Sequence, residues 1–337
     1  MATSSDKVKA ALIGCGGFSK ERPQAALMNT GLYDIVSCYD VARPAAEEAA
    51  LKLGARPCAS LEEALAVDGV EAAILITPNP LHRAQTEAAL AAGKHVFVEK
   101  PMANTVADGL AMVRAADKAR RILMVGHMTR RYRAFRLLHE FLKAGRLGRP
   151  LVAEAHFSHL GGRQLSPPAW RADPAQCPGL PLNVIGCHLV DVLNMFFGRP
   201  HMAAAFHRRA VVPTNNDCTT TILAYDEPLA ATVVSLYVTP QVHEVRVVGT
   251  DLVAEVHAGG GRVVLRDTNK TVEEHEFQGP STALLEEYAE FARAVRHGTP
   301  VETDGRCGLL TVAVIEASVI SAREQRFVSI DDLLQGM

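Results

Sequence analysis

Two short groups of residues in this sequence have side chains that can hold or move a proton. Glu99, Lys100 and Pro101 follow an apolar run, and a lysine next to proline is held on a restricted backbone that would aim its ammonium at a ligand. Such a lysine can donate hydrogen bonds to a hydroxyl and lower the pKa of a neighbouring acid. His188 and Asp191 lie three positions apart on an expected helix, so the carboxylate could orient the imidazole as a general base for an alcohol proton.

A glycine-rich segment, GCGGFS at residues 14–19, connects an apolar run to a helix-like segment. Gly14 would permit a tight turn, and Gly16 would let the backbone approach a pyrophosphate at a helix N-terminus. Ser19 stands where the G-x-G-x-x-G pattern has its third glycine, and it is small enough for close packing. Because glycine turns between strands and helices are common, this segment predicts a dinucleotide site only together with its surroundings.

Two later strand ends supply those surroundings. Asp40 ends the next apolar run, 24 residues after Gly16, where a carboxylate can accept hydrogen bonds from the adenosine ribose hydroxyls and repel a 2′-phosphate. This favours NAD over NADP, while Arg43 could serve a 2′-phosphate and keeps NADP as an alternative. The segment 77–79, Thr-Pro-Asn, closes another apolar run, and ligands of open α/β sheets bind beyond the carboxyl ends of the strands.

The elements that must position these residues alternate through the first third of the chain. Apolar runs typical of buried parallel strands are separated by helix-like segments, which predicts a parallel sheet covered on both faces. The expected strands are residues 8–13, 35–39, 72–76, 95–98 and 122–125, and the expected helices are 42–53, 61–66, 82–91 and 105–120. Ser60, with Glu63 three residues later, indicates a capping box before the second helix.

The pattern changes after about residue 126. Several closely spaced strand-like runs predict an open, largely antiparallel sheet. The expected strands are residues 151–159, 219–224, 230–237, 244–248, 252–256 and 262–265, and the expected helices are 130–144, 181–197, 284–296 and 309–323. The fold class is therefore α/β, with two domains.

Composition excludes several function classes. The chain has 337 residues, 48% of them hydrophobic and 21% charged, with 35 basic and 37 acidic residues. This near balance argues against a nucleic-acid binder or a charge-driven membrane-surface protein. The 7 cysteines are widely spaced without a Cys-x-x-Cys, so neither disulfides nor a zinc ribbon is expected. No signal peptide and no window approaching the ~20 apolar residues of a membrane span is expected, which indicates a cytoplasmic protein.

The order of these groups resembles the glucose–fructose oxidoreductase / inositol dehydrogenase / rhizopine-catabolism (Gfo/Idh/MocA) oxidoreductase family over nearly the whole chain. The resemblance is carried by residues 14–17, Asp40, Thr77-Pro78-Asn79-x-x-His82, Glu99-Lys100-Pro101, Trp170-Arg171 and Gly186-x-His188-x-x-Asp191. It implies an N-terminal NAD(P)-binding Rossmann domain over residues 1–126. It also implies a C-terminal α/β domain over 127–337 for substrate binding and oligomerisation, with the last helix able to pack back on the first domain.

The resemblance further implies an NAD(P)-dependent dehydrogenase or reductase for a secondary alcohol or ketone of a sugar, cyclitol or related polyol. Lys100 and His188 match the family's catalytic lysine and histidine, and Asp191 would orient His188. Family members are commonly homodimers or homotetramers. No metal, nucleic acid or membrane is expected as a partner. The expected cofactor contacts are Gly14, Gly16, Gly17, Phe18, Ser19, Asp40, Thr77, Pro78, Asn79, His82, Glu99 and Lys100.

One position departs from the family pattern. Many members carry an aspartate four residues before the histidine, whereas this chain has Val184, and Asn183 would point elsewhere on an ideal helix. The expected substrate contacts are Lys100, Arg130, His156, Trp170, Arg171, Val184, His188 and His243. His156 and His159 would lie on opposite faces of a strand, which argues against a metal site. Two alternatives stay open: a lyase or glycoside-cleaving enzyme with tightly bound NAD, and a non-catalytic dinucleotide sensor.

Overall fold

The computed structural model describes residues 6–226, 228–257, 259–268, 270–278 and 282–335. Within it the chain divides into two compact units. Unit 1 contains residues up to Ala103, Ala107–His127 and Thr282–Leu309, and unit 2 contains Asn104–Val106, Met128–Ser281 and the residues from Leu310 onward. The change from unit 1 to unit 2 after His127 lies one residue from the expected boundary, but residues 282–309 return to unit 1.

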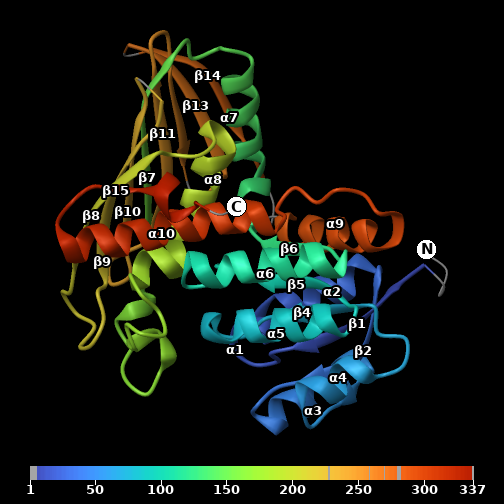
Figure 1. Cartoon of the computed structure of the whole chain (residues 1–337). Helices are drawn as coiled ribbons and strands as arrows, with labels where there is room; N and C mark the ends of the chain where they lie inside the picture. Colours follow the sequence, from blue (N-terminus) through green and yellow to red (C-terminus); the bar gives the residue numbers. More distant parts are fainter. Residues whose placement is uncertain (1–5, 227, 258, 269, 279–281, 336–337) are drawn as a thin grey trace. The chain divides into compact units, whose positions relative to one another are not determined.

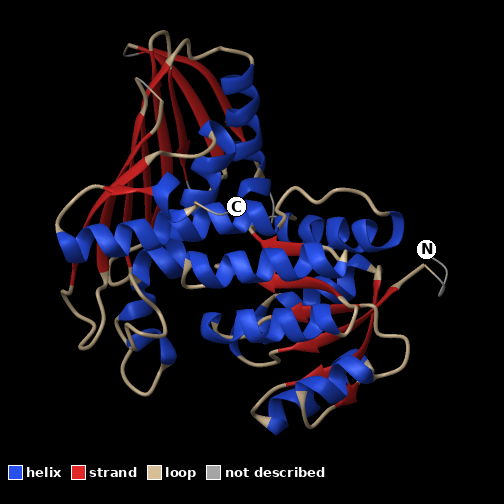
Figure 2. Ribbon diagram, in the orientation of Figure 1, coloured by secondary structure: helices blue, strands red, loops and turns tan. Residues whose placement is uncertain are grey.

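Unit 1 is built on a six-stranded parallel sheet with the strand order of a Rossmann domain. In that order the strands are β3 (Arg56–Pro57), β2 (Tyr33–Tyr39), β1 (Val8–Ile13), β4 (Ala72–Leu75), β5 (His95–Glu99) and β6 (Leu123–Gly126). The central strands are buried apolar runs, because helices cover both faces of the sheet (Figures 1 and 2). Their carboxyl ends therefore meet at one edge, where the glycine loop, Thr77 and Lys100 lie.

The helices of unit 1 follow the expected alternation, with one interruption. After the glycine loop, Pro23 begins a second helix directly behind the first, because its ring provides no N–H to continue the first one. Ser60 Oγ accepts a hydrogen bond from Glu63 N at 3.1 Å, as the capping box predicts. The helices are α1 (Gly17–Glu21), α2 (Pro23–Thr30), α3 (Arg43–Leu53), α4 (Leu61–Ala66), α5 (Asn79–Ala91), α6 (Val106–Ala119, whose first residue belongs to unit 2) and α9 (Ala283–His297).

Unit 2 contains a nine-stranded, mostly antiparallel sheet, in which β7 and β10 form the parallel pair. Its strands in spatial order are β14 (Lys270–Glu276), β13 (Arg262–Asp267), β12 (Val253–His257), β11 (Val242–Gly249), β7 (Pro150–Ser158), β10 (Ala230–Leu236), β9 (Cys218–Ala224), β8 (Met202–Arg208) and β15 (Val328–Ser329). Three strands, β14, β8 and β15, were not expected. The sequence of β14 is charged and that of β15 is brief, so neither has a strand-like apolar pattern.

The helices of unit 2 include one irregular turn that ideal periodicity does not predict. The expected helix at residues 181–197 begins as a π-helix, Leu182–Gly186, and continues as α8 (Cys187–Phe197). Apart from a long helix that begins in unit 1 and is described below, the other helices are α7 (Arg133–Lys143), α11 (Ile330–Leu333) and the 3₁₀ segments Met128–Arg131, Leu160–Gly162 and Trp170–Ala172. The 3₁₀ segment Met128–Arg131, which lies just before α7, is called η1 below.

Helix α10 (Gly305–Glu324) is long and apolar enough to cross a membrane by length and composition alone. This corrects the expectation that no window of the sequence approaches the length of a span. Because 61% of its most apolar window is buried inside the protein, α10 has the character of a core helix.

Candidate active site

The glycine loop between β1 and α1 requires glycine at its first position. Gly14 has a φ of +90°, and a Cβ added there would lie 2.3 Å from the backbone oxygen of Ile76. A Cβ on Gly16 would meet only an oxygen of Asp40, at 3.9 Å, so the backbone there is open to a ligand. Phe18 is exposed, and Ser19 is fully buried in the place of the third glycine. The loop therefore has the cradle that a pyrophosphate needs.

Asp40 lies against this loop. Its Oδ2 accepts hydrogen bonds from Cys15 N at 2.7 Å and from Gly16 N at 3.2 Å, while Oδ1 accepts one from Ala42 N at 2.8 Å. A carboxylate has about four lone-pair sites, so acceptor capacity remains for ribose hydroxyls. Arg43, which would serve a 2′-phosphate, donates instead to Glu47 at 2.8 Å. The residues of this loop fit NAD better than NADP.

His82 joins two of the strand ends at the same edge. Its Nε2 lies 2.8 Å from the backbone oxygen of Thr77, and its Nδ1 lies 3.1 Å from that of Pro101. The imidazole is completely buried, and burial lowers its pKa. His82 was expected among the cofactor contacts, but this geometry makes it a residue that positions the Thr77 and Lys100 loops from behind. Asn79, at the start of α5, is also buried, whereas Thr77, Pro78 and Lys100 are partly exposed.

Glu99 packs beneath the backbone of Lys100. Its Oε2 accepts a hydrogen bond from Lys100 N at 3.3 Å, and a Cβ added to Gly126 would lie 3.3 Å from its carboxyl group. Burial raises the pKa of Glu99 to about 7, against the opposing effect of the Lys100 charge. Burial raises the pKa of Tyr288, and the nearby Glu99 carboxyl adds to this rise. Glu99 was expected to contact the cofactor, and its buried carboxyl instead supports the residue that carries the ammonium.

In unit 2, His188 is held by a residue that sequence reasoning missed. The Nδ1 atom of His188 lies 3.0 Å from Oγ1 of Thr129, a buried residue of η1. The ring of Phe157 also lies near this imidazole, with the two centroids 6.2 Å apart. No short sequence pattern links Thr129 to His188, because the two residues are 59 positions apart. The only available signal was the neighbouring Arg130.

Asp191 has a different partner from the one predicted. Its carboxylate accepts two hydrogen bonds from the Arg130 guanidinium, at 2.8 Å from Nε and 2.5 Å from Nη2. Both side chains are buried. This corrects two expectations. Asp191 was expected to orient His188, but its carboxylate binds Arg130. Arg130 was expected to contact substrate, but its guanidinium binds Asp191. Thr129 takes the place that Asp191 was given at Nδ1 of His188.

The loop that carries Trp170 and the π-helix Leu182–Gly186 both contribute to one apolar cluster. Trp170 and Val184 both pack against the buried residues Cys177, Leu180, Val212 and Val238. The Arg171 guanidinium stacks over the Trp170 ring, 4.5 Å from its centroid. Buried Asn183 donates from Nδ2 to Asn104 Oδ1 at 3.2 Å. Val184 and Trp170, expected at the substrate, are thus explained by packing of the loop onto the helix.

The sheet of unit 2 separates the remaining histidines. His156 pairs across the sheet with Glu244, on the face opposite to Phe157, and therefore does not share the face that carries His188. His243 stacks flat on Phe157, with ring centroids 4.1 Å apart, and burial lowers its pKa to about 4. Both were expected to contact substrate. His156 is placed on the wrong face for that role, and His243 belongs to a buried aromatic cluster.

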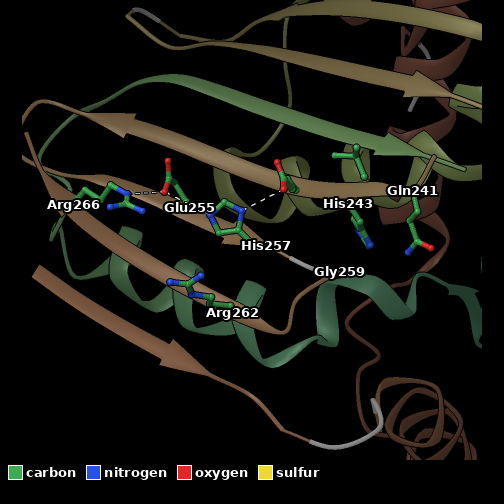
Figure 3. Close-up of a pocket in the computed structure, with 9 residues that line it drawn as sticks. Gln241, His243, Glu255, His257, Gly259, Arg262 and Arg266 are labelled. Carbon is green, nitrogen blue, oxygen red and sulfur yellow. Dashed lines mark hydrogen bonds and ion pairs between the residues drawn. The ribbon is translucent and has the colours of Figure 1, made fainter. Parts of the chain in front are cut away.

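A pocket of about 740 Å³ lies over strands β11, β12 and β13 of unit 2 (Figure 3). Within its lining, Arg266 binds Glu255 at 2.8 Å and His257 lies 3.3 Å from Glu244, whereas Arg262 binds Glu274 outside the pocket. Of the predicted site residues, only His243 lines it; the others in the lining are Gln241, Val242, Glu244, Glu255, His257, Gly259, Arg262 and Arg266. This pocket is distinct from the residues that hold His188.

Comparison with known proteins identifies relatives along most of the chain. D-apiose dehydrogenase of Paraburkholderia graminis is 26% identical over 98% of this chain and 92% of its own length. An inositol 2-dehydrogenase of Rhodococcus erythropolis is 39% identical over 37% of this chain and 36% of its own length. The structure of the WlbA dehydrogenase of Bordetella pertussis, solved with NADH and UDP-GlcNAcA, is 27% identical, with a TM-score of 0.84 and coverage of 96% of this chain and 98% of that one.

Two family models match the chain itself. A model described as an oxidoreductase family with an NAD-binding Rossmann fold matches residues 8–127, and one for the GFO/IDH/MocA C-terminal domain matches residues 135–255. The first covers the glycine loop, Asp40 and Lys100, and the second covers His188 and Asp191. With its NAD-binding Rossmann fold, this chain belongs to the GFO/IDH/MocA oxidoreductase family and is an NAD(P)-dependent dehydrogenase or reductase.

Proposed function

We propose that this protein transfers hydride between nicotinamide and a secondary alcohol or ketone of a sugar, cyclitol or related polyol. The observation that carries the proposal is Lys100 at the carboxyl end of β5, on a loop that His82 ties to the Thr77 loop. Relatives named D-apiose dehydrogenase and inositol 2-dehydrogenase support a polyol substrate. A cytoplasmic location and assembly as a homodimer or homotetramer stay predictions.

When bound, the nicotinamide supplies the acceptor or donor of the hydride. The open backbone at Gly16 would hold the pyrophosphate, and Asp40 would accept hydrogen bonds from the ribose. In the oxidative direction His188 takes the proton of the substrate hydroxyl, and Lys100 stabilises the developing alkoxide through its ammonium. In the reductive direction the same imidazole returns the proton.

A dehydrogenase assay on a panel of sugars and cyclitols with NAD⁺ and NADP⁺ tests this proposal. We expect NADH formation with at least one polyol, and loss of turnover by at least about 100-fold in Lys100→Ala, because general acid–base and electrostatic groups contribute at least that much. The dissociation constant of NAD, measured by calorimetry, should stay nearly unchanged in this variant. Full activity of Lys100→Ala would contradict the role of Lys100.

The same experiment separates the two alternatives. NAD that copurifies without exchanging, together with product formation but no net NADH, would favour elimination or glycoside cleavage by transient oxidation. Bound NAD that no polyol reduces in stopped-flow measurements would favour a sensor.

A further inference from the structure

Nδ1 of His188 binds a hydroxyl, that of Thr129, at 3.0 Å. A histidine that takes a substrate proton must present a ring nitrogen with a lone pair, and the partner of the other nitrogen decides which one that is. With Thr129 at Nδ1, the nitrogen that meets the substrate is Nε2. A hydroxyl can accept a hydrogen bond as well as donate one, so it can serve here without a charge.

We propose that Thr129 is the positioning residue of His188, and that Thr129 Oγ1 accepts a hydrogen bond from Nδ1–H while Nε2 exchanges the substrate proton. The exchange of the substrate proton at Nε2 rests on the proposed function, whereas the hydrogen bond between Thr129 and His188 does not. In the base form the one ring proton is on Nδ1. After the substrate hydroxyl gives its proton to Nε2, the imidazolium keeps the same bond to Thr129. The proton is thus exchanged without any change in the Nδ1–Oγ1 contact.

The neighbouring ion pair explains how Thr129 is held in place. Thr129 and Arg130 are consecutive residues of η1, while His188 and Asp191 lie three residues apart on α8. Arg130 binds Asp191 with two hydrogen bonds, and Thr129 binds His188 with one. Two adjacent residues of one segment therefore attach to two residues one turn apart on the other. The buried bidentate contact, whose geometry is directional, sets the register in which the Thr129 hydroxyl meets the imidazole.

Packing against Phe157 also restricts the imidazole. The Phe157 ring lies 6.2 Å from the His188 ring and is itself stacked on His243 at 4.1 Å. Because Phe157 has no polar group, it can restrict the tilt of the ring but cannot choose between its nitrogens. The polar partner at Nδ1, Thr129, does distinguish the two nitrogens.

Selective ¹⁵N-histidine labelling of the full-length protein without substrate tests the hydrogen bond directly. The His188 signals are assigned as those that disappear in His188→Gln. We expect the neutral ring to carry its proton on Nδ1 in the wild type and in Thr129→Ser, and to lose this signature in Thr129→Val, which has the same shape but no hydroxyl. Thr86→Val is a matched control, because Thr86 is fully buried and its hydroxyl has no hydrogen-bond partner among the described residues.

Kinetics test the consequence for the reaction. We expect Thr129→Val to lower kcat by about 10- to 100-fold with little change in KM, and Thr129→Ser to restore most of it, because Thr129 acts through His188. A wild-type neutral ring with its proton on Nε2, or a Thr129→Val variant that is folded and keeps the wild-type ring signals and kcat, would overturn the proposal. Absence of NAD-dependent polyol turnover in the wild type would overturn the proposed function instead and leave the ring measurement to decide the role of Thr129.

Discussion

Arg130 and Asp191 form a buried, bidentate ion pair, with distances of 2.8 Å from Nε to Oδ2 and 2.5 Å from Nη2 to Oδ1. It joins the segment that follows the Rossmann sheet to the helix that carries His188. A buried pair of this kind contributes little net stability compared with apolar residues, but each charge is costly to leave without its partner. Its value to the protein is the fixed geometry between η1 and α8.

Removing one member of this pair should therefore destabilise the protein strongly. We expect Asp191→Ala to lower the free energy of unfolding by about 3–5 kcal/mol, since it leaves the Arg130 guanidinium buried without its carboxylate. Urea denaturation followed by circular dichroism measures this. The double variant Arg130→Met, Asp191→Leu should recover much of the loss. A single variant within about 1 kcal/mol of the wild type would show that the pair is readily replaced by water.

Gly14 and Gly16 should respond differently to the same substitution. Gly14→Ala places a Cβ 2.3 Å from the backbone of Ile76 at a φ of +90°, so it should destabilise the protein by more than about 1 kcal/mol. Gly16→Ala meets only a side-chain oxygen at 3.9 Å and should fold normally. It should nevertheless weaken NAD binding by about tenfold or more, because the methyl group takes space that the pyrophosphate needs.

Thermal melts and calorimetry with NADH distinguish these two outcomes. Normal NAD affinity in a folded Gly16→Ala protein would argue against pyrophosphate binding at this loop.

Coenzyme preference should depend on the pairing of Arg43. In Asp40→Ser combined with Glu47→Gln, the carboxylate that repels a 2′-phosphate is absent and the guanidinium is released from its 2.8 Å contact. We expect the ratio of NADPH to NADH affinity to rise by about tenfold or more, which corresponds to about 1.4 kcal/mol. Glu47→Gln alone should change it little, because Asp40 remains. Calorimetric titration with both coenzymes is the measurement, and an unchanged ratio in the double variant would exclude Arg43 as a phosphate ligand.

Glu99 should make stability depend on pH. Burial raises its pKa to about 7, above the value of about 4.3 for an unfolded chain. An acid whose pKa is higher in the folded state opposes folding once it must ionise, so the penalty is absent well below about pH 4.3 and complete above about pH 7. The variant Glu99→Gln removes this penalty, because an amide side chain does not ionise. Relative to the wild type, this variant should gain stability as the pH rises through that window, by up to about 4 kcal/mol.

Urea denaturation at several pH values measures the gain, with Glu47→Gln as an exposed control. A stability difference that does not vary with pH would mean that Glu99 is ionised at little cost.

The sequence predicts well what depends on local periodicity. Five of the six parallel strands of unit 1, all but the two-residue β3, and the Ser60 cap appear where the apolar runs and the capping pattern place them. It predicts poorly the partners that only the tertiary fold brings together. Thr129 lies 59 residues from His188, and Arg130 lies 61 from Asp191, so the local i, i+3 pairing of His188 with Asp191 was a reasonable but incomplete interpretation.

Strand position limits the prediction in another way. The alternation of β7 places His156 and Phe157 on opposite faces, but the face that packs against α8 follows from the register of the whole sheet. The acidic, polar strand β14 has no apolar alternation to reveal it. Such features need the three-dimensional pairing of distant segments.

The π-helical turn at Leu182–Gly186 separates the effects of substitution from those of deletion. Cys187 N donates to the backbone oxygen of Leu182, five residues earlier, so this turn holds one more residue than an α-helical turn would. Exchanging side chains leaves that residue count intact. Removing a single residue would convert the widened turn into an α-helical one and shift the positions of the side chains within it. The placement of the side chains just before His188 is therefore encoded in the length of the polypeptide as well as in its chemistry.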